Sequence, residues 1–204
     1  MTPDGLAAEV MARAASRTRF TLAIAGPPGA GKSTLAHSLA GALARPGLSA
    51  AIVPMDGFHL DNAELDRLGL RGRKGAPETF DLSGFDALLS RLALEDDVVI
   101  PVFDRELDLA RAGAARVTAA TRIRIVEGNY LLLDEPGWRD LVRHFDMTVF
   151  LDVPEAELER RLVGRWLAHG HDAPAARERA LSNDIPNARR VIAGSRAADF
   201  MLHG

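Results

Sequence analysis

The apolar residues of this chain gather in five short runs, each about as long as a strand. They occupy residues 21–25, 50–55, 98–103, 122–126 and 147–153. A run that is apolar throughout, without alternation, is typical of a strand that is covered on both faces. Helical patterns lie between most of these runs. This order predicts an α/β fold, in which a doubly wound parallel sheet lies between two layers of helices.

The loop after the first run carries the pattern G-x-x-x-x-G-K-[ST], which is typical of a phosphate-binding loop. Its glycines let backbone N–H groups converge on a polyphosphate at the N-terminus of the next helix. The apolar run FTLAIA before the loop and the Ala- and Leu-rich residues 33–44 after it supply the strand and the helix that the motif needs. The predicted loop consists of Gly26, Pro27, Pro28, Gly29, Ala30, Gly31, Lys32, Ser33 and Thr34.

Lysine is rare in this chain. Of the 25 Lys and Arg residues, only Lys32 and Lys74 are lysines, so 23 are arginines. A compact, flexible ammonium group differs chemically from a planar guanidinium, so each lysine is a candidate for a specific role. We predict that Lys32 reaches the β- and γ-phosphates and that Ser33 binds Mg²⁺. For Lys74 we predict a contact with substrate or phosphate, and the alternative is a solvated loop cation beside Arg71 and Arg73.

Two carboxylates follow predicted strands at the edge of the sheet where ligands bind. Asp56 follows the second run, and there it would serve as a base that meets both the γ-phosphate and a substrate hydroxyl. Glu127 follows the fourth run, and we expect it to face Mg²⁺, directly or through water. The alternatives are a turn or capping role for Asp56 and an ordinary strand-end carboxylate at Glu127.

Three further side chains near these strand ends are candidates for substrate contacts. His59 would bond substrate or orient Asp56, and a purely structural histidine is the alternative. Asp104 and Arg105 follow the third run and would contact the substrate and select it. A surface ion pair is the alternative for these two residues.

Two segments look inserted into a single domain that spans residues 1–204. Residues 67–81 (RLGLRGRKGAPETFD) are rich in glycine and basic residues, so they predict a loop over the crevice. Residues 154–171 are helical and Arg-rich and predict a lid. Arg161 and Arg165 are four residues apart, hence on one helix face, and closure would bring them to the phosphates. Solvated helix arginines are the alternative.

Composition narrows the choice of partner. The formal net charge of −3 offers no basic footprint for nucleic acid or for an anionic membrane, so a small molecule is expected. The chain has no cysteine, and no apolar run approaches the ~20 residues needed to cross a bilayer. These features predict a soluble, cytoplasmic protein.

Together these motifs resemble the P-loop kinases that group uridine kinase, phosphoribulokinase and type I pantothenate kinase. The segments GPPGAGKST, MDGFHL, KGAPETFD, PVFDRELD, VEGNYLLL and FLDVPEAELERRLVGRW occur in that family's order and cover most of the chain. The likeness is greatest to the small bacterial members, including kinases associated with fructose import. The chain departs from type I pantothenate kinases, which carry a longer N-terminal region, and from uridine kinases, which favour D-S-F-Y where this chain has DGFH.

The resemblance implies a P-loop NTPase fold with a sheet of order 2-3-1-4-5, ATP and Mg²⁺ as ligands, transfer to a substrate alcohol, and a homodimer. By the same comparison, Asp56 is the base, Arg165 the lid arginine and Lys74 the lysine of the K-G-x-P-E segment. Asn187, in the segment NDIPNARR, is a candidate for the adenine contact. We therefore predict an ATP-dependent kinase for a small hydroxyl-bearing metabolite such as the sugar fructose, with pantothenate or a nucleoside as the alternative acceptor.

Other classes of P-loop protein fit less well. The segment LLLDEP imitates the second nucleotide motif of ABC-transporter ATPases, but no LSGGQ-like segment precedes it. A GTP switch would need an N-K-x-D motif, which is also missing. A regulatory ATPase without a small-molecule acceptor is distinguished by ATP binding without a phosphorylated product.

Overall fold

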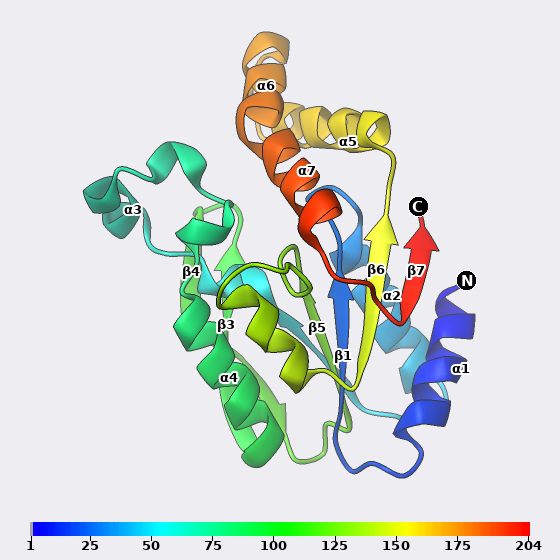
Figure 1. Cartoon of the computed structure of the whole chain (residues 1–204). Helices are drawn as coiled ribbons and strands as arrows, with labels where there is room; N and C mark the ends of the chain where they lie inside the picture. The colour runs from blue at the N-terminus through cyan, green and yellow to red at the C-terminus, as the bar shows by residue number, and fades with distance from the viewer. Residues whose placement is uncertain (1) are drawn as a thin grey trace.

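A five-stranded parallel sheet forms the centre of the computed structural model, which describes residues 2–204 (Figure 1). Its order is β2-β5-β1-β6-β7, and every neighbouring pair is parallel. Four of the five predicted runs form strands of this sheet. The strands are β1 (Phe20–Ala25), β2 (Ala50–Pro54), β5 (Ile123–Gly128), β6 (Met147–Asp152) and β7 (Phe200–His203).

The prediction of a parallel strand at residues 98–103 is wrong. This run belongs to an antiparallel ribbon outside the main sheet, formed by β3 (Asp97–Asp104) and β4 (Leu109–Thr118). Val98 and Ile100 are buried whereas Val99 is exposed, so only one face of β3 packs on the core. The pairing register shifts at Pro101, because proline has no N–H to donate to the ladder. The fifth strand of the main sheet is instead the four-residue β7, which is too short to stand out as a run.

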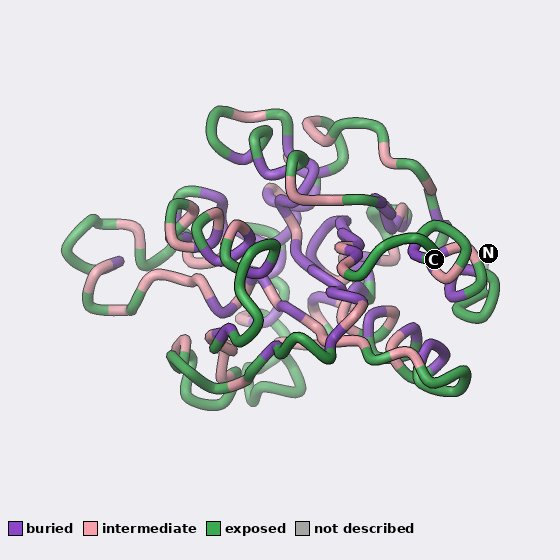
Figure 2. Tube along the Cα trace, turned by 90° about the horizontal axis from the view of Figure 1, so that it is seen from below, coloured by how far each residue is buried: buried purple, intermediate pink, exposed green. Residues whose placement is uncertain are grey.

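Helices cover both faces of the sheet and form the predicted three layers (Figure 1). Successive residues of a strand point to opposite faces. In β1, Leu22 and Ile24 therefore join the core beneath α1 and α2, whereas Ala23 and Ala25 join the core beneath α4. The buried segments meet in the middle of the molecule (Figure 2). The helices are α1 (Pro3–Ala14), α2 (Lys32–Ala44), α3 (Asn62–Leu68), α4 (Leu82–Leu94), α5 (Glu155–Ala168), α6 (Ala173–Arg179) and α7 (Ile185–Gly194).

Short helical turns shape the segments around the ligand-binding edge of the sheet. They are the 3₁₀ turns η1 (Met55–Phe58), η2 (Arg71–Arg73) and η3 (Pro77–Thr79) and the π-helical turn η5 (Ala180–Asp184). A further 3₁₀ turn, η4 (Trp138–His144), packs against α4 and leads into β6. The segment 67–81, predicted as a loop, begins in the last turn of α3 and contains η2 and η3. Within residues 2–204, every helix falls short of the length and apolar character that crossing a membrane requires.

The predicted lid corresponds to α5, which is anchored at its inner face. Leu158 and Leu162 are fully buried in the core beneath α1 and α2, and both contact the position where a Cβ of Gly29 would lie. The lid helix therefore packs directly against the phosphate loop. Together with α6 and α7, this helix stands over the carboxyl ends of β1 and β6 (Figure 1).

Candidate active site

The phosphate loop joins β1 to α2 and presents unpaired helix N–H groups. Gly31 precedes α2 with a left-handed φ of 92°, and no side chain caps the helix. The first amides of α2 are consequently directed to a ligand, which is how helix N-termini bind phosphate. Gly26 has a φ of 151°, and a Cβ there would lie 2.8 Å from the carbonyl oxygen of Leu151. Only glycine permits this close approach of the loop to β6.

Lys32 lies buried at the start of α2, with its ammonium inside the loop. Its Nζ donates to the carbonyl oxygen of Pro27 at 3.0 Å and to Oδ1 of Asn129 at 2.6 Å. Burial lowers the pKa of Lys32 to about 8, although the negative charges of Glu127 and Asp56 act in the opposite direction. The ammonium is thus held between the phosphate loop and the end of β5.

Ser33 and Glu127 meet across the base of the loop. The hydroxyl Oγ of Ser33 donates to Oε1 of Glu127 at 3.0 Å. Burial raises the pKa of Glu127, and the nearby charge of Asp56 adds to this rise. Hydroxyl and carboxylate oxygens suit Mg²⁺, which commonly takes one or two protein ligands together with substrate phosphates and water. No group of three or more His, Asp or Glu side chains in the described chain is placed to hold a metal.

Asp56 sits in η1, directly after β2, with its carboxylate beside Arg105. Nη2 of Arg105 donates to Oδ2 of Asp56 at 3.1 Å. The next residue, Gly57, packs so tightly that a Cβ would lie 2.6 Å from the carbonyl oxygen of Pro101 in β3. The glycine thus lets the β3–β4 ribbon, which carries Arg105, approach the turn that carries Asp56.

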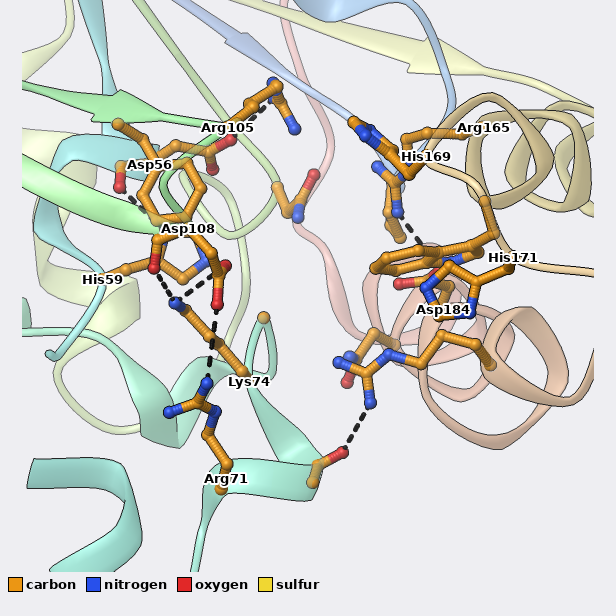
Figure 3. Close-up of a pocket in the computed structure, with 18 of the residues that line it drawn as sticks. Asp56, His59, Arg71, Lys74, Arg105, Asp108, Arg165, His169, His171 and Asp184 are labelled. Atoms are coloured by element: carbon orange, nitrogen blue, oxygen red, sulfur yellow. Dashed lines mark hydrogen bonds and ion pairs between the residues drawn. The ribbon is translucent and has the colours of Figure 1, made fainter. Parts of the chain in front are cut away.

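Two adjoining clefts meet at this carboxylate. One, of about 420 Å³, is lined by the phosphate loop with Lys32, Ser33 and Glu127, and we call it the phosphate-loop cleft. The other, of about 630 Å³, is the outer cleft, and Figure 3 shows residues that line its two walls. Six residues line both clefts: Pro28, Asp56, Arg105, Asn129, Arg165 and His169. The side chains of these shared residues lie where the contents of the two clefts would meet.

Lys74 forms part of the wall of the outer cleft on the same side as Asp56 (Figure 3). Its side chain is only 8% exposed. Its Nζ donates to Oδ1 of Asn62 at 2.7 Å and to the backbone oxygen of Asp108 at 2.6 Å, and pairs with the Asp108 carboxylate at 2.9 Å. Asp108 has a left-handed φ of 52° at the turn between β3 and β4. Lys74 is therefore no solvated loop cation, because it fastens this turn to the segment after α3.

His59 supports the turn that carries Asp56. Its Nδ1 lies 2.8 Å from the backbone oxygen of Asp56. Its ring lies between Phe80 and Phe103, with centroid distances of 4.1 and 4.6 Å. Burial lowers the pKa of His59 and favours the neutral imidazole. His59 therefore packs in the wall of the outer cleft, and its contact with substrate stays a prediction.

Comparison with known proteins identifies the family. Residues 21–197 match the model of the "Phosphoribulokinase / Uridine kinase family". The chain belongs to this family. It is therefore a P-loop kinase, a phosphotransferase with an alcohol group as acceptor, and the family implies that it binds ATP. These findings agree with the resemblance seen in the sequence motifs.

Relatives of the kinase match along most of its length. It is 39% identical to the uncharacterised protein YggC of Escherichia coli K12, over 90% of this chain and 77% of that protein. It is 36% identical to a candidate uridine kinase of Schizosaccharomyces pombe, C227.14, over 90% of this chain and 83% of that protein. The crystal structure of a candidate fructose transport system kinase from Silicibacter sp. TM1040 is 50% identical, covers 99% of both chains and superposes with a TM-score of 0.95.

The opposite wall of the outer cleft in the kinase comes from α5 and η5. Arg165 and Trp166 lie side by side, and Asp184 faces both. Arg161 lies nearer the loop, where its Nε donates to Glu157 at 2.6 Å. Arg165 lines both clefts and Arg161 lines only the phosphate-loop cleft. A contact of either arginine with phosphate stays a prediction.

One predicted substrate contact of the kinase, Asp104, lies away from both clefts. Asp104 lines neither cleft, although Phe103 and Arg105 line the outer one, because successive side chains of a strand point to opposite faces. Its Oδ1 instead accepts the backbone N–H groups of Glu106 and Leu107 in the β3–β4 turn. Asn187 is buried and lines the outer cleft together with Lys74. An adenine contact of Asn187 stays a prediction.

Several residues of the kinase site were missed from sequence. The missed residues that line the outer cleft include Arg71, Phe103, Asp108, Asn129, Trp166, His169, His171, Arg179 and Asp184. Asn129 could have been found, because it follows Glu127 by two positions at a strand end. Arg179 on α6 and Asp184 on η5 could not have been found from sequence. Their spacing does not connect them to the first strands of the sheet, which lie more than a hundred residues earlier.

Proposed function

We propose that the kinase transfers the γ-phosphate of ATP to an alcohol group of a small sugar, such as fructose. Phosphoryl transfer needs a phosphate cradle, a metal, a group that orients the acceptor hydroxyl and cations for the transferred group. The observation that carries the proposal is the place of Asp56, whose side chain lines both clefts. ATP phosphates would occupy the phosphate-loop cleft and the acceptor would occupy the outer cleft.

In this mechanism Asp56 orients the acceptor hydroxyl and receives its proton. The hydroxyl oxygen forms a bond to the γ-phosphorus, the bond from that phosphorus to the β–γ bridging oxygen breaks, and ADP leaves. Lys32 and Arg165 stabilise the charge of the phosphoryl group. Ser33 and Glu127 would hold Mg²⁺, which when bound neutralises phosphate charge. Arg105, paired with Asp56, helps to keep the carboxylate at the junction of the clefts.

The outer cleft has the chemistry of a polyol site. Lys74 and Asp108 place a hydrogen-bond donor and a hydrogen-bond acceptor 2.9 Å apart. Neighbouring hydroxyl groups of a sugar likewise offer donors and acceptors side by side. Phe103 and His59 supply aromatic surface in the same wall. The Silicibacter relative, which is described as a candidate fructose transport system kinase, also supports a sugar acceptor.

The test is a screen followed by one variant. ATP-dependent product formation would be measured with D-fructose, other sugars, nucleosides and pantothenate. Asp56→Asn should lower kcat on the active acceptor by ~10²-fold or more, because a positioned base contributes that much. Near-normal turnover by Asp56→Asn would refute the role of the base. Turnover of a nucleoside or pantothenate alone would refute the sugar assignment.

A further inference from the structure

A buried carboxylate that the proposed mechanism leaves unused faces the lid arginine. Asp184 is the last residue of the π-helical turn η5 and is 8% exposed. Its Oδ2 accepts a hydrogen bond from Nη2 of Arg165 at 3.1 Å and another from Nε1 of Trp166 at 2.6 Å. Figure 3 shows Asp184 beneath Arg165, across the cleft from Lys74 and Asp108. A carboxylate is costly to bury unless it is paired, and here its partners are one charge and one indole N–H.

Arg165 is fixed at one end and open at the other. A guanidinium has five N–H donors. Among residues 2–204, that of Arg165 makes one side-chain hydrogen bond, through Nη2 to Asp184. Its side chain is 33% exposed and lines both clefts. The remaining donors are therefore available to groups bound where the two clefts meet.

Trp166 keeps Asp184 in place. Its indole N–H bonds the same carboxylate oxygen that holds Arg165. The ring is itself packed between two cations, with the guanidinium carbons of Arg165 and Arg179 at 5.3 and 5.4 Å from its centroid. Asn183, the neighbour of Asp184 in η5, donates to the backbone oxygen of Lys74 at 2.9 Å. The turn is thereby anchored to both walls of the outer cleft.

We propose that Asp184 is a positioning residue for phosphoryl transfer. Together with Trp166, it holds the guanidinium of Arg165 at the junction of the clefts, where the transferred phosphoryl group passes. A long flexible side chain stabilises developing charge best when it is already oriented. The proposal rests on the role of Arg165 in the proposed function.

Kinetics test this role in variants that preserve shape. Asp184→Asn keeps an oxygen for the indole N–H but removes the charge. We expect kcat to fall by roughly 10- to 10²-fold, as for a misplaced catalytic group, with the KM for MgATP changed by less than about twofold. In an Arg165→Gln background, Asp184→Asn should cause no further loss, because Asp184 acts through Arg165. A full further loss in that background would overturn the proposal.

The control is a second ion pair of the lid. Glu159→Gln removes the contact between Glu159 and Arg177, 3.0 Å apart and outside both clefts. It should leave kcat unchanged. Each variant is assayed with MgATP and D-fructose, and separately with MgATP alone for hydrolysis. Fructose turnover that is missing in every variant and in the parent refutes the sugar assignment, whereas an Asp184 effect on hydrolysis still supports the positioning role.

Fluorescence reads the contact without turnover. The chain has two tryptophans, Trp138 and Trp166, and Trp138 lies in the core. The Trp166→Phe variant therefore gives the Trp138 background for subtraction. We expect Asp184→Asn to shift the Trp166 emission and Glu159→Gln to leave it unchanged. An emission that is the same in Asp184→Asn and in the parent would overturn the proposed contact.

Discussion

Gly57 controls the position of Asp56 through a single close approach, and Gly57→Ala tests this. The residue lies in the 3₁₀ turn η1, where its backbone conformation is open to any residue, so φ is not the reason for glycine. The reason is space. A Cβ at this position would lie 2.6 Å from the backbone oxygen of Pro101, whereas ordinary contact begins at 3.4 Å.

The size of the effect follows from that distance. The turn and the β3 backbone must separate by about 0.8 Å, since 3.4 minus 2.6 is 0.8. Neither atom group is a flexible side-chain end, so the strain is shared by two backbones. Overpacking of this kind costs about 1–3 kcal/mol. For a domain of this size, the loss corresponds to a decrease in Tm of about 2–12 °C. A displacement approaching 1 Å at Asp56 should also lower kcat by up to ~10²-fold.

The assay combines thermal unfolding with ATP-dependent phosphorylation of the acceptor. Gly41→Ala is the matched control, because it lies in α2 and a Cβ there meets nothing within 4 Å. Replacing a glycine inside a helix stabilises by roughly 0.5–1 kcal/mol, so Tm should rise and kcat should stay unchanged. If Gly57→Ala retained the parental Tm and kcat, the argument from the Pro101 contact would be wrong.

Two further predictions concern charged side chains. Arg190 bonds Glu135 through its Nε at 2.7 Å, and this hydrogen bond lowers the pKa of Glu135 below its ordinary value of 4.5. A carboxyl whose pKa is lower in the folded protein than in the unfolded one stabilises the folded state at pH values above its unfolded pKa. This stabilisation is lost as the pH falls through the pKa of the folded state. Arg190→Gln should therefore lower Tm most at pH 7, and the difference in Tm between parent and variant should shrink below pH 4.5. A Tm difference that stays constant down to pH 3 would contradict this. Lys74→Gln should raise the KM for the acceptor by about tenfold, because the variant loses the charged hydrogen bonds that shape the wall of the outer cleft. The KM for ATP should stay unchanged. Saturation kinetics with an unaltered acceptor KM would show that Lys74 does not shape the cleft.

The donor half of the site was predictable because it is local. The phosphate loop, the strand before it and the helix after it lie within one stretch of chain, and the motif depends on that order. Asp56 and Glu127 were found because the ends of parallel strands share one edge of a sheet. The same reasoning failed at Asp104. Asp104 belongs to β3, which pairs with β4 outside the main sheet, and its carboxylate accepts N–H groups of the β3–β4 turn, whereas its neighbour Arg105 lines both clefts.

The acceptor half depended on contacts that are distant in sequence. The rarity of lysine pointed to Lys74, but only the structure placed its ammonium against Asp108, 34 positions later. Similarly, the lid pattern pointed to Arg165 without indicating that η5 supplies its carboxylate partner. Such pairs depend on how the β3–β4 ribbon packs against the segment after α3 and on how the last helices pack together. The periodicity of apolar residues does not predict this packing.

By itself, the sequence determined the fold class, the family, the phosphate cradle and the carboxylates at two strand ends. The physical reason is that periodicity and loop chemistry act between neighbouring residues, and the edge of a parallel sheet extends that information to a few fixed positions. Tertiary structure alone decided which strand left the sheet, how closely Gly57 approaches Pro101, and which side chains form the walls of the outer cleft. These features depend on distances between segments far apart in the chain, which only the packed core sets.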